Sequence, residues 1–321
     1  MTDAFKRRIE YMRISITDRC NLRCIYCMPK NIPYVFKQNI MSYEEILSIC
    51  SIMSELGVKA VRVTGGEPLN RRGCVGFLRQ LKAVSGIERV SLTTNATLLE
   101  PHIEELAKLG LFSINISLNS LDDEIYHRIT GQNMFESVWS NIEKALEFGL
   151  NIKINCVLVE GFNESEILPL TRLALRYPIS VRFIELMPTE VNASLKGVFI
   201  ENVLDVISAE FNLKSDITPY QPYGHGPAKY FKSDGMKGNI GFISALSDNF
   251  CESCNRVRLS SEGYLKLCLH RSQGLNLRKM LRSGASDEEI KKAIEESIAL
   301  KPKSHRLKTH TEVKNMSQIG G

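Results

Sequence analysis

The feature that most constrains the fold is a series of short apolar segments that alternate with helical patterns as far as residue 186. Each segment is rich in Val and Ile and nearly continuous in its apolar character, as in strands buried on both faces of a parallel sheet. The segments are Arg13–Thr17, Ala60–Thr64, Val90–Thr94, Ser113–Leu118, Ile152–Leu158 and Ile179–Leu186. Strand–helix units of this kind join by right-handed crossovers, so the sequence predicts an α/β fold around a parallel sheet.

Start and stop signals delimit the helices between these segments. Ser42 and Glu45 have the spacing of a capping box, and Gly57 ends the helix that follows. Asn163 and Glu166 have the same spacing and predict a second capped helix start. The other helical patterns are Leu168–Tyr177, Pro101–Leu109 and Glu136–Phe148. Six units are fewer than the eight of a closed barrel, so we expect an open, partial parallel β/α barrel.

The alternation ends near residue 187, which predicts a second, smaller domain. Residues 200–212 have one more helical pattern, and a Gly-, Pro- and Tyr-rich stretch follows at Pro219–Pro227. We therefore expect a partial-barrel domain over residues 1–190 and a C-terminal domain with a polar tail over residues 191–321.

Composition excludes several classes of protein. The 321 residues include 41 Lys and Arg against 36 Asp and Glu, and a net charge of +5 is too small to predict nucleic-acid binding. No apolar run approaches the roughly 20 residues of a membrane helix, and Met1–Tyr11 does not resemble a secretory signal. We therefore expect a cytoplasmic protein, either monomer or homodimer, that binds no membrane. Nine cysteines in a reducing compartment indicate metal ligands or buried side chains.

Three cysteines follow the first predicted strand at the spacing C-x3-C-x2-C. Cys20, Cys24 and Cys27 can hold one four-iron cluster from a single loop, because thiolates are the usual ligands of such clusters. Three ligands for four irons leave one iron open to a chelating cofactor. Structural zinc is the alternative, but zinc normally takes four ligands, and no fourth Cys or His lies nearby in the sequence.

A second set has the spacing C-x2-C-x13-C and comprises Cys251, Cys254 and Cys268. On spacing alone, a zinc site completed by His270 and a second iron–sulfur cluster are about equally favoured. The other three cysteines are Cys50, Cys74 and Cys156. We interpret them as buried small hydrophobic side chains and not as catalytic thiols.

Basic residues occur on strands that should otherwise be apolar. Those residues are Arg13, Arg62, Lys153 and Arg182. Buried strands rarely carry Lys or Arg without a partner. Arg256 and Arg258 lie two residues apart, so on an extended chain they face the same side. Salt bridges at strand ends are one interpretation, and a cationic cage for phosphate groups is the other.

Two motifs resemble those of the radical SAM superfamily. The loop Asp18-Arg19-Cys20-Asn21-Leu22-Arg23-Cys24-Ile25-Tyr26-Cys27 is similar to the signature loop of that superfamily, and Gly65-Gly66-Glu67-Pro68 is similar to its second motif. The resemblance implies S-adenosylmethionine (SAM) as a cofactor, electron transfer to its sulfonium, and a 5′-deoxyadenosyl radical that abstracts a substrate hydrogen. The cofactor supplies that chemistry, and the protein positions it.

A narrower resemblance spans nearly the whole chain. Phe250–Leu259 with Gly263 and Cys268 is similar to the C-terminal motif of the molybdenum cofactor biosynthesis protein A family, the GTP 3′,8-cyclases. Thr17–Asn21, Met28-Pro29 and the terminal Ile319-Gly320-Gly321 match the same family in the same order. The resemblance implies two [4Fe-4S] clusters, the second binding the guanine base. It also implies conversion of GTP to 3′,8-cyclo-7,8-dihydro-GTP in the first step of molybdenum cofactor biosynthesis.

The same resemblance implies roles for individual residues and partners. The cluster ligands are Cys20, Cys24, Cys27, Cys251, Cys254 and Cys268. The SAM contacts are Tyr26, Gly66, Ser117 and Met187. The GTP contacts are Arg13, Arg62, Thr93, Lys153, Arg256, Val257 and Arg258. Catalytic roles are implied for Arg256, Arg258, Gly320 and Gly321, with the tail inside the barrel. The implied partners are a flavodoxin- or ferredoxin-type reductant and a cyclic pyranopterin monophosphate synthase.

Two alternatives stay open at this point. One is another radical SAM enzyme with an auxiliary cluster, such as a peptide-modifying enzyme. The Arg-x-Arg at 256–258 and the Gly-Gly terminus argue against it. The other is a non-catalytic iron–sulfur electron carrier, which the three-ligand sets and the GGEP motif oppose. The chain departs from the family pattern at Asn119, where many members have Asp, at Ala60, and in the short segment Met187–Val191.

Overall fold

A computed structural model describes residues 1–28, 31, 34–215, 226–248, 250–271, 273–305 and 316. Within these residues the strands form one continuous sheet in the order β12-β11-β10-β1-β2-β3-β4-β5-β6-β9-β8-β7. The strands are β1 (Tyr11–Ser15), β2 (Ala60–Thr64), β3 (Arg89–Thr94), β4 (Ser113–Ser117), β5 (Ile152–Leu158), β6 (Ser180–Glu185), β7 (Lys214–Ser215), β8 (Lys229–Lys232), β9 (Asn239–Ile243), β10 (Arg256–Leu259), β11 (Tyr264–Lys266) and β12 (Gly274–Asn276).

The centre of this sheet is parallel and its edges are antiparallel. β10, β1 to β6 and β9 run parallel to one another, while β11 and β12 at one edge and β8 and β7 at the other run antiparallel. The edge strands β12 and β7 do not pair with each other, so the sheet stays open. This confirms the predicted α/β fold with a partial parallel barrel.

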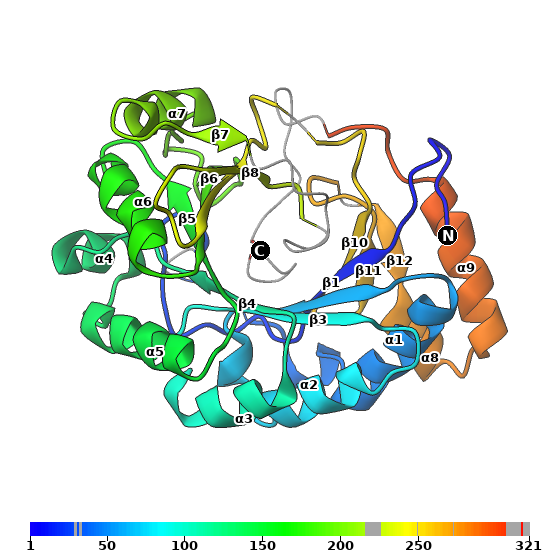
Figure 1. The fold of residues 1–321 in the computed structure, drawn as a ribbon. Helices are drawn as coiled ribbons and strands as arrows, with labels where there is room; N and C mark the ends of the chain where they lie inside the picture. Colours follow the sequence, from blue (N-terminus) through cyan, green and yellow to red (C-terminus); the bar gives the residue numbers. More distant parts are fainter. Residues whose placement is uncertain are drawn as a thin grey trace.

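Helices cover the convex face of the curved sheet, and the concave face surrounds the interior of the half-barrel (Figure 1). The α-helices are α1 (Tyr43–Glu55), α2 (Cys74–Lys82), α3 (Ile103–Leu109), α4 (Asp123–Thr130), α5 (Phe135–Glu147), α6 (Ile167–Arg176), α7 (Ile200–Ser208), α8 (Leu277–Arg282) and α9 (Asp287–Ala299). Short 3-10 helices occur at Lys37–Asn39, Pro68–Asn70, Glu100–His102 and Glu164–Glu166.

The six predicted strands are all present with small shifts at their ends, and one of the two predicted helix caps is wrong. Ser42 Oγ accepts a hydrogen bond from the N–H of Glu45 (3.1 Å), and the Glu45 carboxylate accepts one from the N–H of Ser42 (2.7 Å). Asn163 instead accepts from the N–H of Val159 (2.9 Å) and donates to the carbonyl of Asn119 (2.9 Å). The Asn163 side chain therefore joins two loops and does not cap a helix.

The C-terminal part of the chain extends both edges of the N-terminal sheet. β9 pairs with β6, with Ile240 beside Val181, and β10 pairs with β1, with Arg258 beside Arg13. This pairing brings the second cysteine set next to the first strand of the chain. The division into two domains at residue 190 stays a prediction.

The central strands present different chemistry on their two faces. Ile14 and Val63 have no exposed area and belong to the core between sheet and helices. Side chains alternate along a strand, so the neighbouring Arg13 and Arg62 lie on the opposite face. Both arginines line the cavity inside the half-barrel. The apolar residues of the strands thus hold the fold, and the alternate residues form the site.

Candidate active site

Both cysteine sets line one cavity of about 290 Å³. The first set reaches it from the loop after β1, and the second reaches it from the segments on either side of β10. The six side chains, all free thiols of intermediate exposure, are Cys20, Cys24, Cys27, Cys251, Cys254 and Cys268. Because β10 lies beside β1, residues more than 200 positions apart in the sequence share one interior.

Local hydrogen bonds shape the first cysteine loop as a tight turn. The Cys24 carbonyl accepts from the N–H groups of Cys27 and Met28, each at 3.0 Å. The Cys20 sulfur accepts from the N–H of Leu22 (3.4 Å) and from Asn95 Nδ2 (3.7 Å). Burial raises the pKa of Cys20 to about 11 and that of Cys27 to about 12. These thiols therefore ionise only with a strong cationic partner such as iron.

The glycine turn after β2 packs directly against this loop. The N–H of Gly66 donates to the carbonyl of Thr17 (2.6 Å), and the N–H of Glu67 donates to the carbonyl of Arg19 (2.8 Å). A Cβ atom at Gly66 would lie 2.2 Å from the Arg19 carbonyl oxygen. Such a distance is sterically forbidden, so position 66 requires glycine.

Glu67 has a role that sequence reasoning missed. Its buried carboxylate accepts from Thr94 Oγ1 (2.7 Å), from the N–H of Asn95 (2.7 Å) and from the N–H of Leu69 (3.0 Å). Burial raises the pKa of Glu67 to about 7, although these hydrogen bonds oppose the rise. Glu67 thereby ties the glycine turn to the end of β3. The GGEP motif includes Glu67, but only the fold shows that Glu67 accepts hydrogen bonds from the end of β3.

The second cysteine set differs from the first in its electrostatics. The N–H of Cys254 donates to the carbonyl of Cys251 (3.2 Å), which closes the turn before β10. Burial favours the neutral Cys254 thiol, but Lys301 and Arg256 nearby reverse that effect and lower its pKa below the ordinary value. The surroundings of Cys254 thus favour a thiolate even before a metal is considered, whereas burial raises the pKa of Cys251.

Arginines form a row across the concave face. Arg258 on β10, Arg13 on β1 and Arg62 on β2 occupy directly adjacent register positions. Like charges placed opposite each other destabilise a sheet, so this row favours a bound anion. Arg62, Arg182 and Arg256 make no ion pair with a carboxylate in the described part of the chain, and the Nε atom of each is buried without a hydrogen-bond partner there. The salt-bridge interpretation therefore fails for these three.

Lys153 lies beside this row without lining the cavity. It is 2% exposed on β5, and its Nζ lies 5.6 Å from the centre of the Phe112 ring. Burial lowers the pKa of Lys153 to about 6, and the nearby charges of Arg182 and Arg62 add to the effect. Lys153 is therefore mostly deprotonated at neutral pH and can accept a proton when an anion binds nearby.

The structure gathers the four residues expected to contact SAM. Tyr26, Gly66, Ser117 and Met187 all line the same cavity as the first cysteine set. Tyr26 Oη accepts a hydrogen bond from Asn119 Nδ2 (3.0 Å). Asn119, one of the departures from the family pattern, thus orients this ring.

Asn192, which sequence reasoning missed, holds the segment after β6 against the first cysteine loop. Its Nδ2 donates to the carbonyls of Tyr26 and Met187, each at 3.1 Å, and its Oδ1 accepts from the N–H of Thr189 (2.8 Å). Asn192 is 2% exposed. Nothing in the local sequence indicates these contacts, because the two segments lie far apart in the chain.

The remaining GTP and tail predictions have mixed outcomes. Arg13, Arg62, Thr93, Arg256 and Arg258 all line the cavity. Val257 also lines it, although its side chain belongs to the hydrophobic core. Gly320 and Gly321 lie outside the described residues, whereas Met316 in the tail lines the cavity.

The donor set suits iron–sulfur clusters. Among the described residues, no three His, Cys, Asp or Glu side chains converge on the position of a single metal ion. A four-iron cluster instead binds each thiolate to a different iron, so its ligands surround a larger volume. The buried Thr93 Oγ1, like the arginine Nε atoms, has no hydrogen-bond partner in the described structure. The two thiol sets therefore suit clusters, and the unpartnered donors suit an anionic ligand.

No α-helix among the described residues is long and apolar enough to cross a membrane.

Comparisons with known proteins agree with this geometry. Residues 14–174 match the family model described as Radical SAM superfamily, and residues 179–307 match Molybdenum Cofactor Synthesis C. A solved structure of Streptococcus suis SuiB bound to S-adenosylmethionine is similar with a TM-score of 0.64, at 16% identity, over 85% of this chain and 64% of that one. At that identity the likeness shows the fold alone.

Relatives at higher identity extend over the full length. A protein of Clostridium perfringens named GTP 3′,8-cyclase is 44% identical over 325 residues, which cover 100% of both chains. A protein of Heliobacterium modesticaldum with the same name is 42% identical over 328 residues, again covering 100% of both. The chain therefore belongs to the GTP 3′,8-cyclase family of radical SAM enzymes.

Proposed function

We propose that this enzyme converts GTP to 3′,8-cyclo-7,8-dihydro-GTP, the first step of molybdenum cofactor biosynthesis. The observation that carries the proposal is that two three-cysteine sets and an arginine row line one cavity. A SAM-cleaving site next to a cationic face is what a nucleoside triphosphate substrate requires. The full-length identity to proteins named GTP 3′,8-cyclase supports the same reaction.

The first cysteine set and its surroundings would hold a cluster and SAM. Cys20, Cys24 and Cys27 would ligate three irons, which leaves the fourth for the amino and carboxylate groups of SAM. When both are bound, the cluster would supply the electron and SAM would supply the 5′-deoxyadenosyl radical that starts the reaction. The tight turn at Gly66 lets the backbone approach SAM closely, and Tyr26, Ser117 and Met187 complete its pocket.

The second cysteine set and the arginines would hold GTP. Cys251, Cys254 and Cys268 would ligate a second [4Fe-4S] cluster whose open iron contacts the guanine. The triphosphate would lie on Arg13, Arg62, Thr93, Arg256 and Arg258, with Val257 contributing backbone. Lys153, which is buried outside the cavity lining, would contribute its charge from nearby. Held at both ends, the ribose would present its C3′ hydrogen toward the SAM side of the cavity. Residues 1–190 would thus generate the radical and hold part of the triphosphate, and residues 191–321 would hold the guanine and the rest of the triphosphate.

Gly320 and Gly321 would complete the site. Met316 already lines the cavity, so five further residues can reach its interior. Glycine lets the backbone approach a substrate closely. Deleting the last two residues should leave cluster content and GTP affinity nearly unchanged and should reduce cyclised product sharply. Product formation at the wild-type rate would show that the two glycines are idle.

Other predictions concern the partners and location of the enzyme. A flavodoxin- or ferredoxin-type protein would supply the electron, and a cyclic pyranopterin monophosphate synthase would consume the product. A cytoplasmic location and a monomeric or homodimeric state stay predictions.

One experiment separates the proposed function from the alternatives. Reconstituted, reduced enzyme is incubated anaerobically with SAM and GTP, and 5′-deoxyadenosine and nucleotide products are measured by mass spectrometry. We expect both 5′-deoxyadenosine and a cyclised nucleotide that has the mass of GTP but separates from it by chromatography, and ATP in place of GTP should give no cyclised product. Formation of 5′-deoxyadenosine with no change in GTP would favour a different radical SAM reaction. Failure to cleave SAM under any condition would favour an electron carrier.

A further inference from the structure

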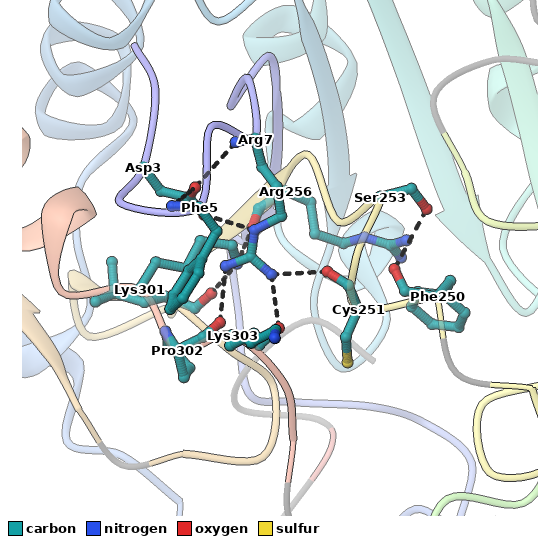
Figure 2. A network of polar contacts seen from close by, with 11 residues as sticks. Asp3, Phe5, Arg7, Phe250, Cys251, Ser253, Arg256, Lys301, Pro302 and Lys303 are labelled. Carbon is teal, nitrogen blue, oxygen red and sulfur yellow. Dashed lines mark hydrogen bonds and ion pairs between the residues drawn. The ribbon is translucent and has the colours of Figure 1, made fainter.

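We propose that Arg7 is a positioning residue that joins the second cysteine loop to the start of the C-terminal tail and so fixes both together. Arg7 lies in the segment before β1 and is 8% exposed. Its Nη1 donates to the carbonyls of Cys251 (2.7 Å) and Lys303 (2.9 Å), and its Nη2 donates to the carbonyl of Pro302 (2.7 Å). Figure 2 shows the guanidinium between these two segments.

The contacts of Arg7 require an arginine. One planar guanidinium serves three backbone carbonyls while its Nε donates to Asp3 Oδ2 (2.6 Å). Asp3 also accepts from the N–H groups of Phe5 (2.9 Å) and Arg7 (3.0 Å), which fixes the loop that carries both. The fork of an arginine can hold such an arrangement, whereas the compact ammonium of lysine cannot span it. Each of the three nitrogens of this buried guanidinium donates a hydrogen bond, four in all, which indicates a geometric role.

A second buried cation secures the same segment. Lys301 is 3% exposed, and its Nζ donates to the carbonyl of Arg256 (3.0 Å) and to that of Leu267. Arg256 follows Cys254 by two residues, and Leu267 precedes Cys268. Arg7 and Lys301 therefore donate hydrogen bonds to backbone carbonyls within two residues of each of the three cysteines. In Figure 2 the carbonyl of Cys251 points toward Arg7 and its sulfur points away.

The tail leaves this junction toward the cavity. His305 lies two residues beyond Lys303, lines the cavity, and its Nε2 is 3.2 Å from the carbonyl oxygen of Ala245. Met316 lines the cavity as well. Pro302 and Lys303 at the start of the tail are thus held by the same side chain that holds the Cys251 loop. This inference rests on the proposed function. In it, Arg7 couples SAM cleavage to GTP conversion, although Arg7 is not among the residues that line the cavity.

The test compares R7A and R7K with R8A in the reconstituted full-length enzyme. Arg8 is the matched control, because it is the adjacent arginine and its side chain is 75% exposed, paired only with Glu10 among the described residues. Three quantities are measured: amide hydrogen exchange by mass spectrometry, iron per chain, and the ratio of 5′-deoxyadenosine to cyclised product. Exchange and iron content are measured without GTP, so they remain informative if GTP proves not to be the substrate.

We expect both Arg7 variants to exchange faster at 250–256 and 301–305 while peptides of β3 to β5 stay unchanged. SAM cleavage should continue, and the ratio of 5′-deoxyadenosine to cyclised product should rise about 10- to 100-fold, the scale on which misplaced reacting groups lose rate. R8A should match wild type in all three measurements. If R7A does not fold, R7K alone decides. Wild-type exchange in both segments, or a wild-type product ratio in R7K, would overturn the proposal.

Discussion

At the scale of single residues, buried positive charge without a carboxylate partner is the most informative feature of the site. Arg62, Arg182 and Arg256 carry buried Nε atoms that lack hydrogen-bond partners within the described residues. Folding places them there at a cost in desolvation, because burying charge is unfavourable without a counter-charge. A bound triphosphate, as proposed above, would supply that counter-charge. Two predictions follow from this arrangement.

Arg256→Ala should weaken GTP binding and leave SAM binding intact. A hydrogen bond to a charged group contributes about 1.5–3 kcal/mol, so the dissociation constant for GTP should rise about 10- to 100-fold. Arg79→Ala is a suitable control, because Arg79 lies on α2 with a side chain that is 62% exposed. The measurement is equilibrium binding of GTP and of SAM to the reconstituted enzyme. Unchanged GTP affinity would assign Arg256 a structural role only.

Lys153 should take up a proton when GTP binds. Its folded-state pKa of about 6 lies below the ordinary 10.5, so the GTP-free lysine is mostly neutral at pH 7.5. A nearby triphosphate favours the charged form, so binding should absorb up to one proton per chain, and affinity should increase as pH falls from 8 toward 6. Titration calorimetry in buffers of different ionisation enthalpy measures this uptake.

Two variants sharpen the Lys153 test. Lys153→Met should abolish the dependence of the binding enthalpy on the buffer, because no ionisable group remains at that position. Lys144→Met should retain it, since Lys144 is exposed and pairs with Glu100 at 3.1 Å. Equal proton uptake in wild type and Lys153→Met would show that another group titrates.

At the scale of elements, the turns after the strands position the first cysteine set more directly than the strands themselves do. The glycine turn at 65–66 contacts the cysteine loop through its backbone, and Glu67 ties the same turn to β3. The glycine turn thus fixes the position of the first cysteine set relative to the sheet.

Gly66→Ala should disrupt the first cysteine loop. The added Cβ would lie 2.2 Å from the Arg19 carbonyl oxygen, and its other nearest atoms are also backbone atoms of Arg19 and Cys20, which cannot move aside as a flexible side chain can. We expect iron per chain to fall by about half and SAM binding to be lost. Gly76→Ala in α2 is the matched control: nothing lies within 4 Å of its Cβ, so the change should stabilise the helix by about 0.5–1 kcal/mol. Normal iron content in Gly66→Ala would contradict this account.

At the scale of the whole molecule, the continuity of the sheet decides the architecture of the site. β10 and β9 attach C-terminal residues to β1 and β6, so one cavity collects both cysteine sets. The conformation of each set is local, but their meeting depends on strand pairing between distant segments.

Each cysteine set should hold one four-iron cluster, about eight irons per chain after anaerobic reconstitution. Replacing Cys251, Cys254 and Cys268 with Ala should leave about four irons and preserve reductive SAM cleavage, whereas replacing the first set should abolish cleavage. Replacing Cys50, Cys74 and Cys156, which are all buried in the structure, should leave iron content unchanged. Stoichiometric zinc at the second set in iron-replete protein would contradict the two-cluster proposal.

The sequence by itself determined the strand–helix order, the two cysteine sets and the basic strand residues, because each depends on periodicity or spacing within a short window. It did not reveal that residues after 190 would extend the sheet at both edges, that Glu67 would hold β3, or that Arg7 would reach Cys251. The failed Asn163 cap has the same origin, since its side chain bonds to the N–H of Val159 in its own loop and to the carbonyl of Asn119 in the loop after β4. Such contacts depend on which groups become neighbours once the chain has folded. Only the tertiary structure could therefore decide them.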